Sequence, residues 1–140
     1  MSKLNRVVVF DSKPLGEICN PIKRVQTKKL TNFIREQNLA IRVAEITDYE
    51  LRRELTLQQF NKGLNNLNKF RQKQQIIPID SESLITATQL WAEIRKTGQA
   101  TADNKNIDCD VIMVAQALQL SEQFQQIIIL TIDVKDLFRF

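Results

Sequence analysis

Val7-Val8-Val9-Phe10-Asp11 is a run of four apolar residues that ends in a carboxylate. A continuous apolar run of this kind is typical of a strand that is buried on both faces of a parallel sheet. The later run Ile127-Ile128-Ile129-Leu130 has the same character, and Asp133 follows it closely. A carboxylate just beyond a buried strand costs solvation energy unless it is paired or binds a cation. The two runs therefore predict buried strands with acidic residues beyond their carboxyl ends.

Strand and helix patterns alternate through the rest of the chain. Apolar runs predict the strands, and apolar residues at helical spacing predict the helices between them. The connections are long enough for parallel pairing, so we expect a three-layer α/β/α fold with a central, mainly parallel sheet, formed by residues 1–140 as a single domain. The expected strands are residues 7–10, 40–46, 75–79 and 126–131, and the expected helices are residues 15–19, 27–37 and 109–120, together with helices that begin at Thr47, at a Thr56 cap and at an Asp80 or Ser81 cap.

Composition excludes several kinds of chemistry. The 140 residues contain no histidine, which excludes Ser-His-Asp triads, imidazole zinc sites and histidine acid–base catalysis. Three scattered glycines cannot build a phosphate-binding loop, and two cysteines are too few for a structural zinc site or a disulfide framework. No apolar run approaches the roughly 18 residues of a membrane span, and the N-terminus does not resemble a signal peptide. We expect a cytoplasmic protein with reduced cysteines, in which carboxylates, hydroxyls, amines or a metal do the chemistry.

Four acidic residues stand where predicted strands or turns lead into helices: Asp11, Glu50, Asp110 and Asp133. Because parallel strands end at one edge of their sheet, such residues converge on the crevice where open α/β folds bind ligands. Carboxylate oxygens are the ligands that hard cations such as Mg²⁺ and Mn²⁺ prefer. The pattern therefore predicts a divalent-cation site at this edge.

Most of these acids also have a purely structural interpretation. Thr47 and Glu50 have the spacing of a capping box, in which Glu50 would only satisfy a free backbone amide. A helix dipole favours Asp110 near the start of its helix, where Asp108 could serve as the cap. Asp133 could be a simple turn residue. Asp11 is the hardest to explain in this way, because Asn or Gly would serve a strand-end turn equally well.

The positive charge of the chain is concentrated near its N-terminus. The net charge is +4, and residues 1–30 contain seven basic residues against two acidic ones. A basic rim around an acidic pocket suits a polyanion whose phosphates must reach a metal. A solvated positive surface explains the charge alone equally well.

Four segments of the sequence together resemble the motifs of the PIN-domain family, the nucleases that include VapC-type toxins. The first is Val-Val-Val-Phe-Asp11-Ser12, which is similar to the family's apolar strand followed by Asp and a small hydroxyl residue. The others are Ile46-Thr47-Asp48-Tyr49-Glu50-Leu51, the helix that starts with Asp110-Val111-Ile112, and Leu130-Thr131-Ile132-Asp133. They occur in family order, and their acidic residues are separated by 39, 60 and 23 residues.

This resemblance implies a metal-dependent ribonuclease that uses Mg²⁺ or Mn²⁺. Asp11, Asp110 and Asp133 would hold the metal, and Glu50 would ligate it directly or through water, or orient the nucleophile. The metal would activate water and neutralise charge on the phosphate. We do not expect Glu45 to be part of the site, and Asp103 and Asp136 are expected to have secondary or structural roles.

Two neighbours of Asp11 are candidates for substrate binding. Ser12 would hydrogen-bond a carboxylate or the phosphate. Lys13 departs from the family pattern, which usually has a small or amide residue there. Its charge would either contact the scissile phosphate or weaken metal binding by repulsion.

The resemblance also implies partners. RNA would be the substrate, a cognate antitoxin would cover the active site, and the chain would form a homodimer. Antitoxins of such pairs often place an Arg or Lys among the acidic residues. The apolar stripe of Phe60, Leu64 and Leu67 is either part of the core or a contact surface, and the core is the favoured interpretation.

Two other functions remain open. One is a non-catalytic PIN-like module that binds RNA or protein without cleavage, an interpretation that Lys13 supports. The other is a phosphotransfer or phosphatase-like α/β domain with Asp11 as nucleophile. Such phosphatases usually carry a second Asp two residues later, where this chain has Lys13.

Overall fold

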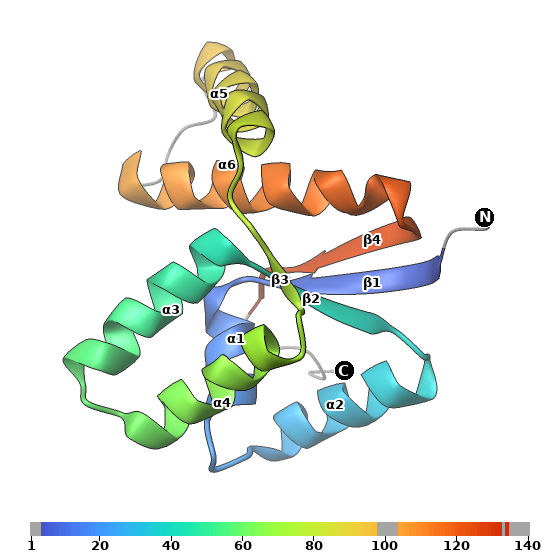
Figure 1. The fold of residues 1–140 in the computed structure, drawn as a ribbon, viewed down its shortest axis with the longest axis vertical. Helices are drawn as coiled ribbons and strands as arrows, with labels where there is room; N and C mark the ends of the chain where they lie inside the picture. The colour runs from blue at the N-terminus through green and yellow to red at the C-terminus, as the bar shows by residue number, and fades with distance from the viewer. Residues whose placement is uncertain (1–3, 98–103, 133, 135–140) are drawn as a thin grey trace.

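The computed structural model describes residues 4–97, 104–132 and 134. Strands and helices alternate along the chain as the sequence predicts (Figure 1). In chain order the elements are β1 (Leu4–Phe10), α1 (Ser12–Cys19), α2 (Val25–Glu36), β2 (Ala40–Ala44), α3 (Glu45–Leu57), α4 (Asn61–Gln72), β3 (Ile76–Ile77), α5 (Ser81–Lys96), α6 (Asn104–Leu118), the 3₁₀ turn η1 (Gln119–Glu122) and β4 (Phe124–Leu130).

The four strands form one parallel sheet in the order β3-β2-β1-β4. Val7 of the central strand β1 is in register with Ala40 of β2 on one side and with Ile127 of β4 on the other. All strands run in the same direction, so their carboxyl ends share one edge of the sheet. The predicted α/β/α fold with a central parallel sheet is therefore confirmed.

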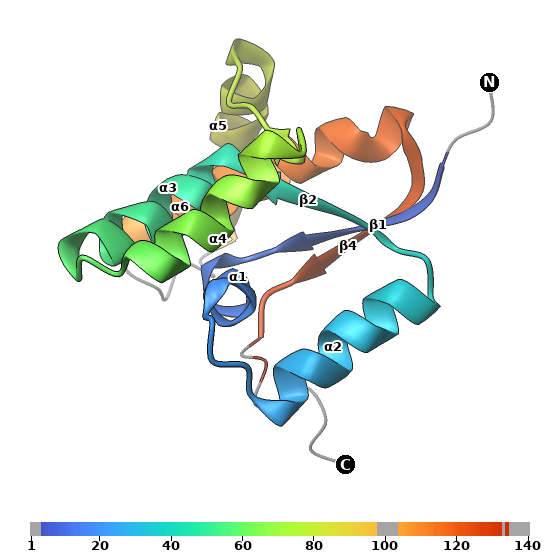
Figure 2. The ribbon, with the colours of Figure 1, turned by 60° about the horizontal axis from the view of Figure 1, so that its bottom comes forward.

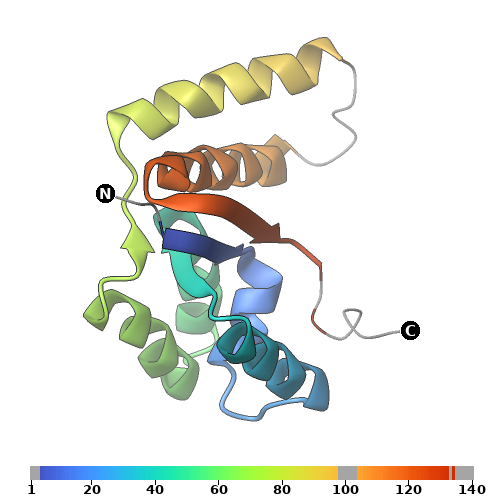
Figure 3. The same ribbon diagram turned by 90° about the vertical axis from the view of Figure 1, so that its right-hand side faces the viewer.

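Strand β1 is buried on both faces, as its continuous apolar run predicts. Val8 and Phe10 belong to the larger core, which packs against α1–α4, whereas Val7 and Val9 pack with Ala117 and Phe124 on the opposite face. The sheet thus lies between α6 on one side and the N-terminal helices on the other, an arrangement that Figure 3 shows edge-on. Burying apolar side chains on both faces contributes about 1.5–3 kcal/mol for each fully buried residue of this size.

Helix α5 lies outside this three-layer arrangement. It packs on α6, where Ala87 of α5 meets Val111 and Ala115 of α6 (Figures 1 and 3). Its N-terminus has the predicted Asp80 cap: Asp80 accepts a hydrogen bond from the Ser83 backbone N–H at 2.8 Å. None of the helices in the described ranges is long and apolar enough to cross a membrane.

The boundaries of α3 differ from the prediction at both ends. The strand predicted for residues 40–46 ends at Ala44, and α3 begins at Glu45 rather than Thr47. The helix then continues through Thr56, whose hydroxyl donates to the Arg52 carbonyl within the helix. The predicted Thr56 cap is therefore wrong, because α4 begins only at Asn61.

The apolar stripe of α4 belongs to the core, as favoured by the sequence. Leu67 is fully buried, and Phe60 and Leu64 pack against the same cluster. Helix α4 lies beside α3 and α1 (Figure 2). Two other apolar residues are not buried as the helical spacing suggested. Phe33 on α2 is 47% exposed, and Leu57 at the end of α3 is 80% exposed.

Other predicted boundaries differ by a few residues. Helix α1 begins directly after Asp11, three residues before the predicted start, and β3 contains only Ile76 and Ile77. Helix α6 begins at Asn104, five residues before the predicted start at residue 109, so Asp108 lies inside the helix. The predicted Asp108 cap is therefore wrong.

Candidate active site

Asp11 stands at the carboxyl edge of the sheet, between the two longest strands. Its backbone N–H donates to the Leu130 carbonyl of β4 at 2.9 Å, which fixes the turn that leaves β1. Its extended backbone makes it the N-cap of α1, and its Oδ1 accepts from the Ser12 backbone N–H at 2.7 Å. One carboxylate oxygen is thus used locally, and it orients the half-buried side chain at the edge of the sheet.

Glu50 approaches Asp11 from α3. Partial burial raises the pKa of the Glu50 carboxyl, and the negative charges of Asp11 and Asp110 raise it further. The Arg53 guanidinium and a side-chain hydrogen bond with Cys109 act in the opposite direction on this pKa. Coulombic effects of this kind require the groups to be close together, because solvent screens charges beyond about 10 Å. Glu50 therefore belongs to the same acidic cluster as Asp11.

Asp110 enters the cluster from α6. Desolvation raises the pKa of its carboxyl, and the charge of Asp11 adds to the effect. The structure thus brings three of the four predicted acids together from three separate elements: Asp11 at the β1–α1 junction, Glu50 on α3 and Asp110 on α6. The fourth, Asp133, lies outside the described residues, as do Asp103 and Asp136.

The structural interpretations of Glu50 and Asp110 do not hold. The predicted Thr47–Glu50 capping box is wrong, because Ala44 is the N-cap of α3 and Thr47 lies within its first turn. The Thr47 hydroxyl is buried and has no hydrogen-bond partner among the described residues. Asp110 is the seventh residue of α6, beyond the first turn where a helix dipole stabilises a carboxylate.

The cluster has the chemistry of a divalent-cation site, although its side chains are not gathered around one point. All three acids offer carboxylate oxygens, the donors that Mg²⁺ and Mn²⁺ prefer, and a cation would relieve their mutual repulsion. Within the described ranges, no three acidic or cysteine side chains are close enough together to hold one ion. The side chains of Asp11, Glu50 and Asp110 would therefore have to close around a cation.

The sequence patterns did not indicate two residues, Cys109 and Arg53, that act on Glu50 in the structure. Cys109 makes a side-chain hydrogen bond with Glu50, and burial raises the pKa of its thiol to about 11, so the thiol stays protonated at neutral pH. Both cysteines are free. Arg53 is one helical turn beyond Glu50, and its positive charge lowers the pKa values of Glu50 and Cys109. The signal for both was present in the sequence, since Cys109 adjoins Asp110 and Arg53 is at i+3 from Glu50.

The predicted substrate-binding residues flank Asp11 at the start of α1. Ser12 is half-buried, and its backbone N–H is the group that binds Asp11. Lys13 is exposed to solvent, where a flexible ammonium can reach a bound polyanion.

Two other acidic residues near the start of α3 have structural contacts. Glu45 accepts a hydrogen bond from the Ile79 backbone N–H at 3.0 Å and lies 3.5 Å from Arg71. Asp48 is only 1% exposed and accepts hydrogen bonds from Arg52 and Arg71. Through Arg71, both Glu45 and Asp48 connect α3 to α4. Glu45 also connects α3 to the segment between β3 and α5.

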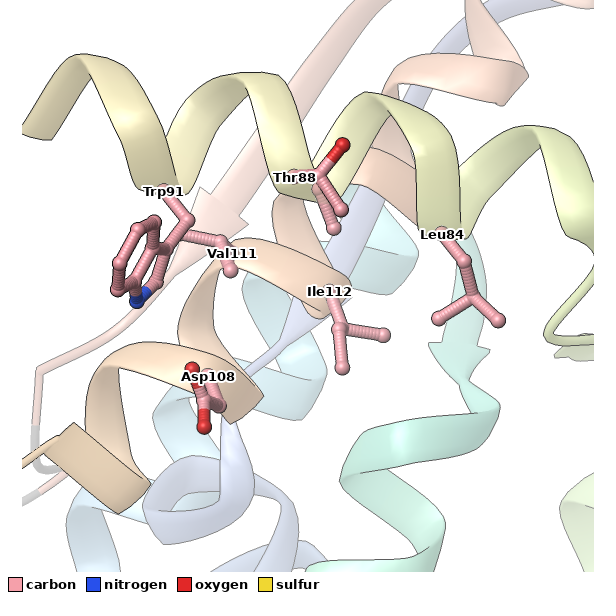
Figure 4. A pocket seen from close by; sticks show the side chains of 7 residues that line it. Leu84, Thr88, Trp91, Asp108, Val111 and Ile112 are labelled. Atoms are coloured by element: carbon pink, nitrogen blue, oxygen red, sulfur yellow. The ribbon is translucent and has the colours of Figure 1, made fainter.

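An apolar cavity of about 380 Å³ lies between α5 and α6 (Figure 4). Leu84 and Trp91 line it from α5, and Val111 and Ile112 line it from α6. Among the described residues that line it, Asp108 is the one acidic residue, and Asp11, Glu50 and Asp110 do not contribute. The cavity is therefore separate from the acidic cluster.

Comparison with known proteins supports the fold. No protein-family model and no curated protein sequence matches the chain. Among solved structures, the chain is similar to FitAcB from Neisseria gonorrhoeae, with a TM-score of 0.60 and 18% sequence identity over 82% of this chain and 83% of that chain. At this identity the similarity concerns the fold alone. The chain has a PIN-like α/β/α fold with an acidic cluster at the carboxyl edge of its sheet.

Proposed function

We propose that this protein is a metal-dependent endoribonuclease that hydrolyses RNA phosphodiester bonds. The observation that carries the proposal is the convergence of Asp11, Glu50 and Asp110, in which burial and the charge of Asp11 raise the pKa values of the Glu50 and Asp110 carboxyls. Three acids that repel one another are tolerated where they bind a cation or do chemistry, and perturbed pKa values concentrate at such sites. The proposal is supported by the position of the cluster at the carboxyl edge of a parallel sheet in a PIN-like fold, because α/β folds bind ligands at this edge.

In this proposal Asp11 and Asp110 hold an Mg²⁺ or Mn²⁺ ion, with Asp133 as the third ligand that the sequence suggests. When bound, the cation stabilises negative charge on the phosphate and makes water a better nucleophile at neutral pH. Asp11 is oriented for this role by the Ser12 backbone N–H. Asp11 and Asp110 thus belong to the β1–α1 junction and to α6, and the core packs β1 against α6.

Glu50 orients the attacking water or accepts its proton. Its raised pKa brings the carboxylate closer to the neutral range in which a general base works efficiently. Ser12 and Lys13 would contact the substrate from the start of α1.

The direct test is cleavage of labelled single-stranded RNA by the purified protein with Mg²⁺, Mn²⁺ or EDTA. We expect metal-dependent cleavage that Asp11→Asn abolishes and Glu50→Gln slows by about 10²–10⁴-fold. Glu54→Gln is the matched control, because Glu54 is an exposed acid one turn further along α3. Cleavage that survives in EDTA, or that Asp11→Asn leaves intact, would contradict the proposal.

The toxin role is a further part of the proposal and rests on the resemblance to VapC-type proteins. Expression of the chain alone should arrest bacterial growth, and Asp11→Asn should remove the arrest. A cognate antitoxin would then be expected to block the acidic cluster, with an Arg or Lys of the partner among the carboxylates. A homodimer, which light scattering would detect, is proposed on the same resemblance.

One observation favours a second candidate, a non-catalytic PIN-like module that binds RNA or protein. In the described ranges the acids do not already form a set that could hold an ion. If calorimetry detects no Mn²⁺ binding and several RNAs remain intact, this second function replaces the first.

A further inference from the structure

The outward face of α3 carries an exposed aromatic residue directly beside the acidic cluster. Tyr49 precedes Glu50 in the chain and is 56% exposed. The guanidinium of Arg53, one turn further along the helix, lies over its ring at 5.4 Å from the centroid. A cation above an exposed ring modestly favours this orientation, and the exposed part of the ring can contact another molecule.

A cleft of about 420 Å³ extends from this ring along α3. Its lining is largely apolar, and it combines the Tyr49 ring, the stems of Arg52 and Arg53, and the side chains of Thr56 and Leu57. Leu57 is 80% exposed, so the cleft is open to solvent along the helix. Single exposed apolar residues are ordinary, but an aromatic ring, an arginine and an open apolar surface together form a shape that a flat ring can occupy.

Arg53 gives the cleft a positive charge that a phosphate of a nucleic acid can contact. Arg52 is neutralised by Asp48, with which it forms a salt bridge at 2.9 Å. Arg53 lies over Tyr49, and its charge also lowers the pKa of Glu50, so this one guanidinium acts on both the cleft and the acidic cluster. A nucleotide adjacent to a phosphate in the cluster would place its base near Tyr49 and a phosphate near Arg53. Aromatic rings and guanidinium planes are the surfaces on which unpaired bases stack.

We propose that Tyr49 and Arg53 form a base-stacking subsite for single-stranded RNA, next to the position of the scissile phosphate. The inference rests on the proposed function for the position of that phosphate. The base stacks on the Tyr49 ring, and Arg53 contributes its guanidinium plane and its charge. Stacking on an aromatic ring and a guanidinium plane suits every base, so the subsite contributes affinity more than sequence specificity.

The test measures the affinity of the full chain for a fluorescent single-stranded RNA of about ten nucleotides, in EDTA so that no cleavage occurs. Tyr49→Ala should raise the Kd by about ten-fold, whereas Tyr49→Phe should stay within about two-fold of the wild type because the ring remains. Trp91→Ala is the matched control. Trp91 is also a partly exposed aromatic residue with an arginine over its ring, but it lies on α5.

A second measurement identifies the stacked base. Single abasic positions are introduced along the RNA and tested against the wild type and Tyr49→Ala. We expect one or two adjacent positions at which base removal weakens binding to the wild type but not to Tyr49→Ala. Equal losses in both proteins at every position would overturn the subsite, and so would wild-type affinity in Tyr49→Ala. If the wild type binds no RNA in EDTA or in Mn²⁺, the base-stacking subsite is also overturned. A protein partner would then be the remaining occupant of this face of α3.

The same experiments separate the subsite from the nuclease proposal. Metal-dependent cleavage by a protein whose RNA affinity does not depend on Tyr49 would overturn only the subsite. RNA binding that depends on Tyr49, in a protein that cleaves nothing with any metal, would overturn only the nuclease.

Discussion

Asp48 and Glu50 lie two residues apart on α3, and their carboxylates have opposite electrostatic surroundings. Asp48 is 1% exposed, and its Oδ1 accepts hydrogen bonds from Arg52 at 2.9 Å and from Arg71 at 3.2 Å. Glu50 instead faces the negative charges of Asp11 and Asp110. Because residues two positions apart point to different sides of a helix, one face of α3 carries a structural acid and another face carries a candidate site acid.

The difference predicts opposite effects on stability. Asp48→Asn removes a charge that two arginines bind, and we expect it to lower the free energy of unfolding by about 1–3 kcal/mol. Glu50→Gln removes a charge whose neighbours repel it, so in the absence of metal the free energy of unfolding should rise or stay unchanged. Urea denaturation of both variants in EDTA measures the two effects. A clear loss of stability in Glu50→Gln would mean that Glu50 has a structural role.

The sequence predicted the sheet and its acidic edge because both depend on local patterns. Four consecutive apolar residues in β1 are sufficient to indicate burial on two faces, and the parallel pairing follows from the alternation of strands and helices. Asp11 could be singled out for the same reason. Its position directly after the strand fixes it at the sheet edge, whatever the rest of the fold does.

The end of α3 could not be predicted because its backbone signal is absent from the sequence. The helix ends through Gln59, which has a positive φ of 56°, a conformation that glycine usually provides. The Phe60 N–H then donates back to the Leu55 carbonyl. No glycine or proline marks this end, so the sequence pattern favours Thr56 as the cap of the next helix. The start of α6 was missed for a related reason, because residues 104–108 are mostly polar and show no apolar periodicity.

The contacts of the site depend on tertiary packing, which a single sequence does not contain. Glu50 and Cys109 are 59 residues apart in the chain and meet only because α3 packs against α6. No local pattern relates these two side chains. The adjacency of Cys109 to Asp110 was visible, but its use as a donor to Glu50 was not.

The raised pKa values predict how stability depends on pH and on metal. In the folded state the carboxyls of Glu50 and Asp110 have pKa values above their ordinary values of 4.5 and 3.8. The folded state therefore binds protons more tightly, and the resulting stabilisation is present below the ordinary pKa values and lost as the pH rises through the raised ones. We expect the wild type, compared with the double variant Glu50→Gln and Asp110→Asn, to lose relative stability across this range in EDTA.

Added Mn²⁺ should restore that stability at neutral pH in the wild type but not in the double variant. Ligand binding to the folded state alone raises stability with concentration, by about 2.7 kcal/mol at a hundred times the Kd. Thermal unfolding at several Mn²⁺ concentrations measures the effect. An equal increase in both proteins would show that Mn²⁺ binds elsewhere.

The hydrogen bond between Cys109 and Glu50 predicts a specific change in titration. The thiol, whose pKa is about 11, remains a donor at neutral pH and lowers the pKa of Glu50. Cys109→Ala should therefore raise the pKa of Glu50 further, whereas Cys109→Ser keeps a donor and should stay closer to the wild type. Nuclear magnetic resonance of the Glu50 side-chain carboxyl in EDTA gives this pKa directly. If alanine and serine give the wild-type value, the thiol does not act on Glu50.

The buried hydroxyl of Thr47 provides a test of the local structure of α3. Its Oγ1 has no hydrogen-bond partner among the described residues, and a buried polar group left unpaired costs about 1–3 kcal/mol. Thr47→Val has nearly the same shape and similar helix propensity, so it should raise the free energy of unfolding by about 1 kcal/mol. A capping box at Thr47 would give the opposite sign, a loss of about 1 kcal/mol. Thr56→Val is the control, because Thr56 is exposed and its hydroxyl bonds to the Arg52 carbonyl, and urea denaturation of the two variants distinguishes these outcomes.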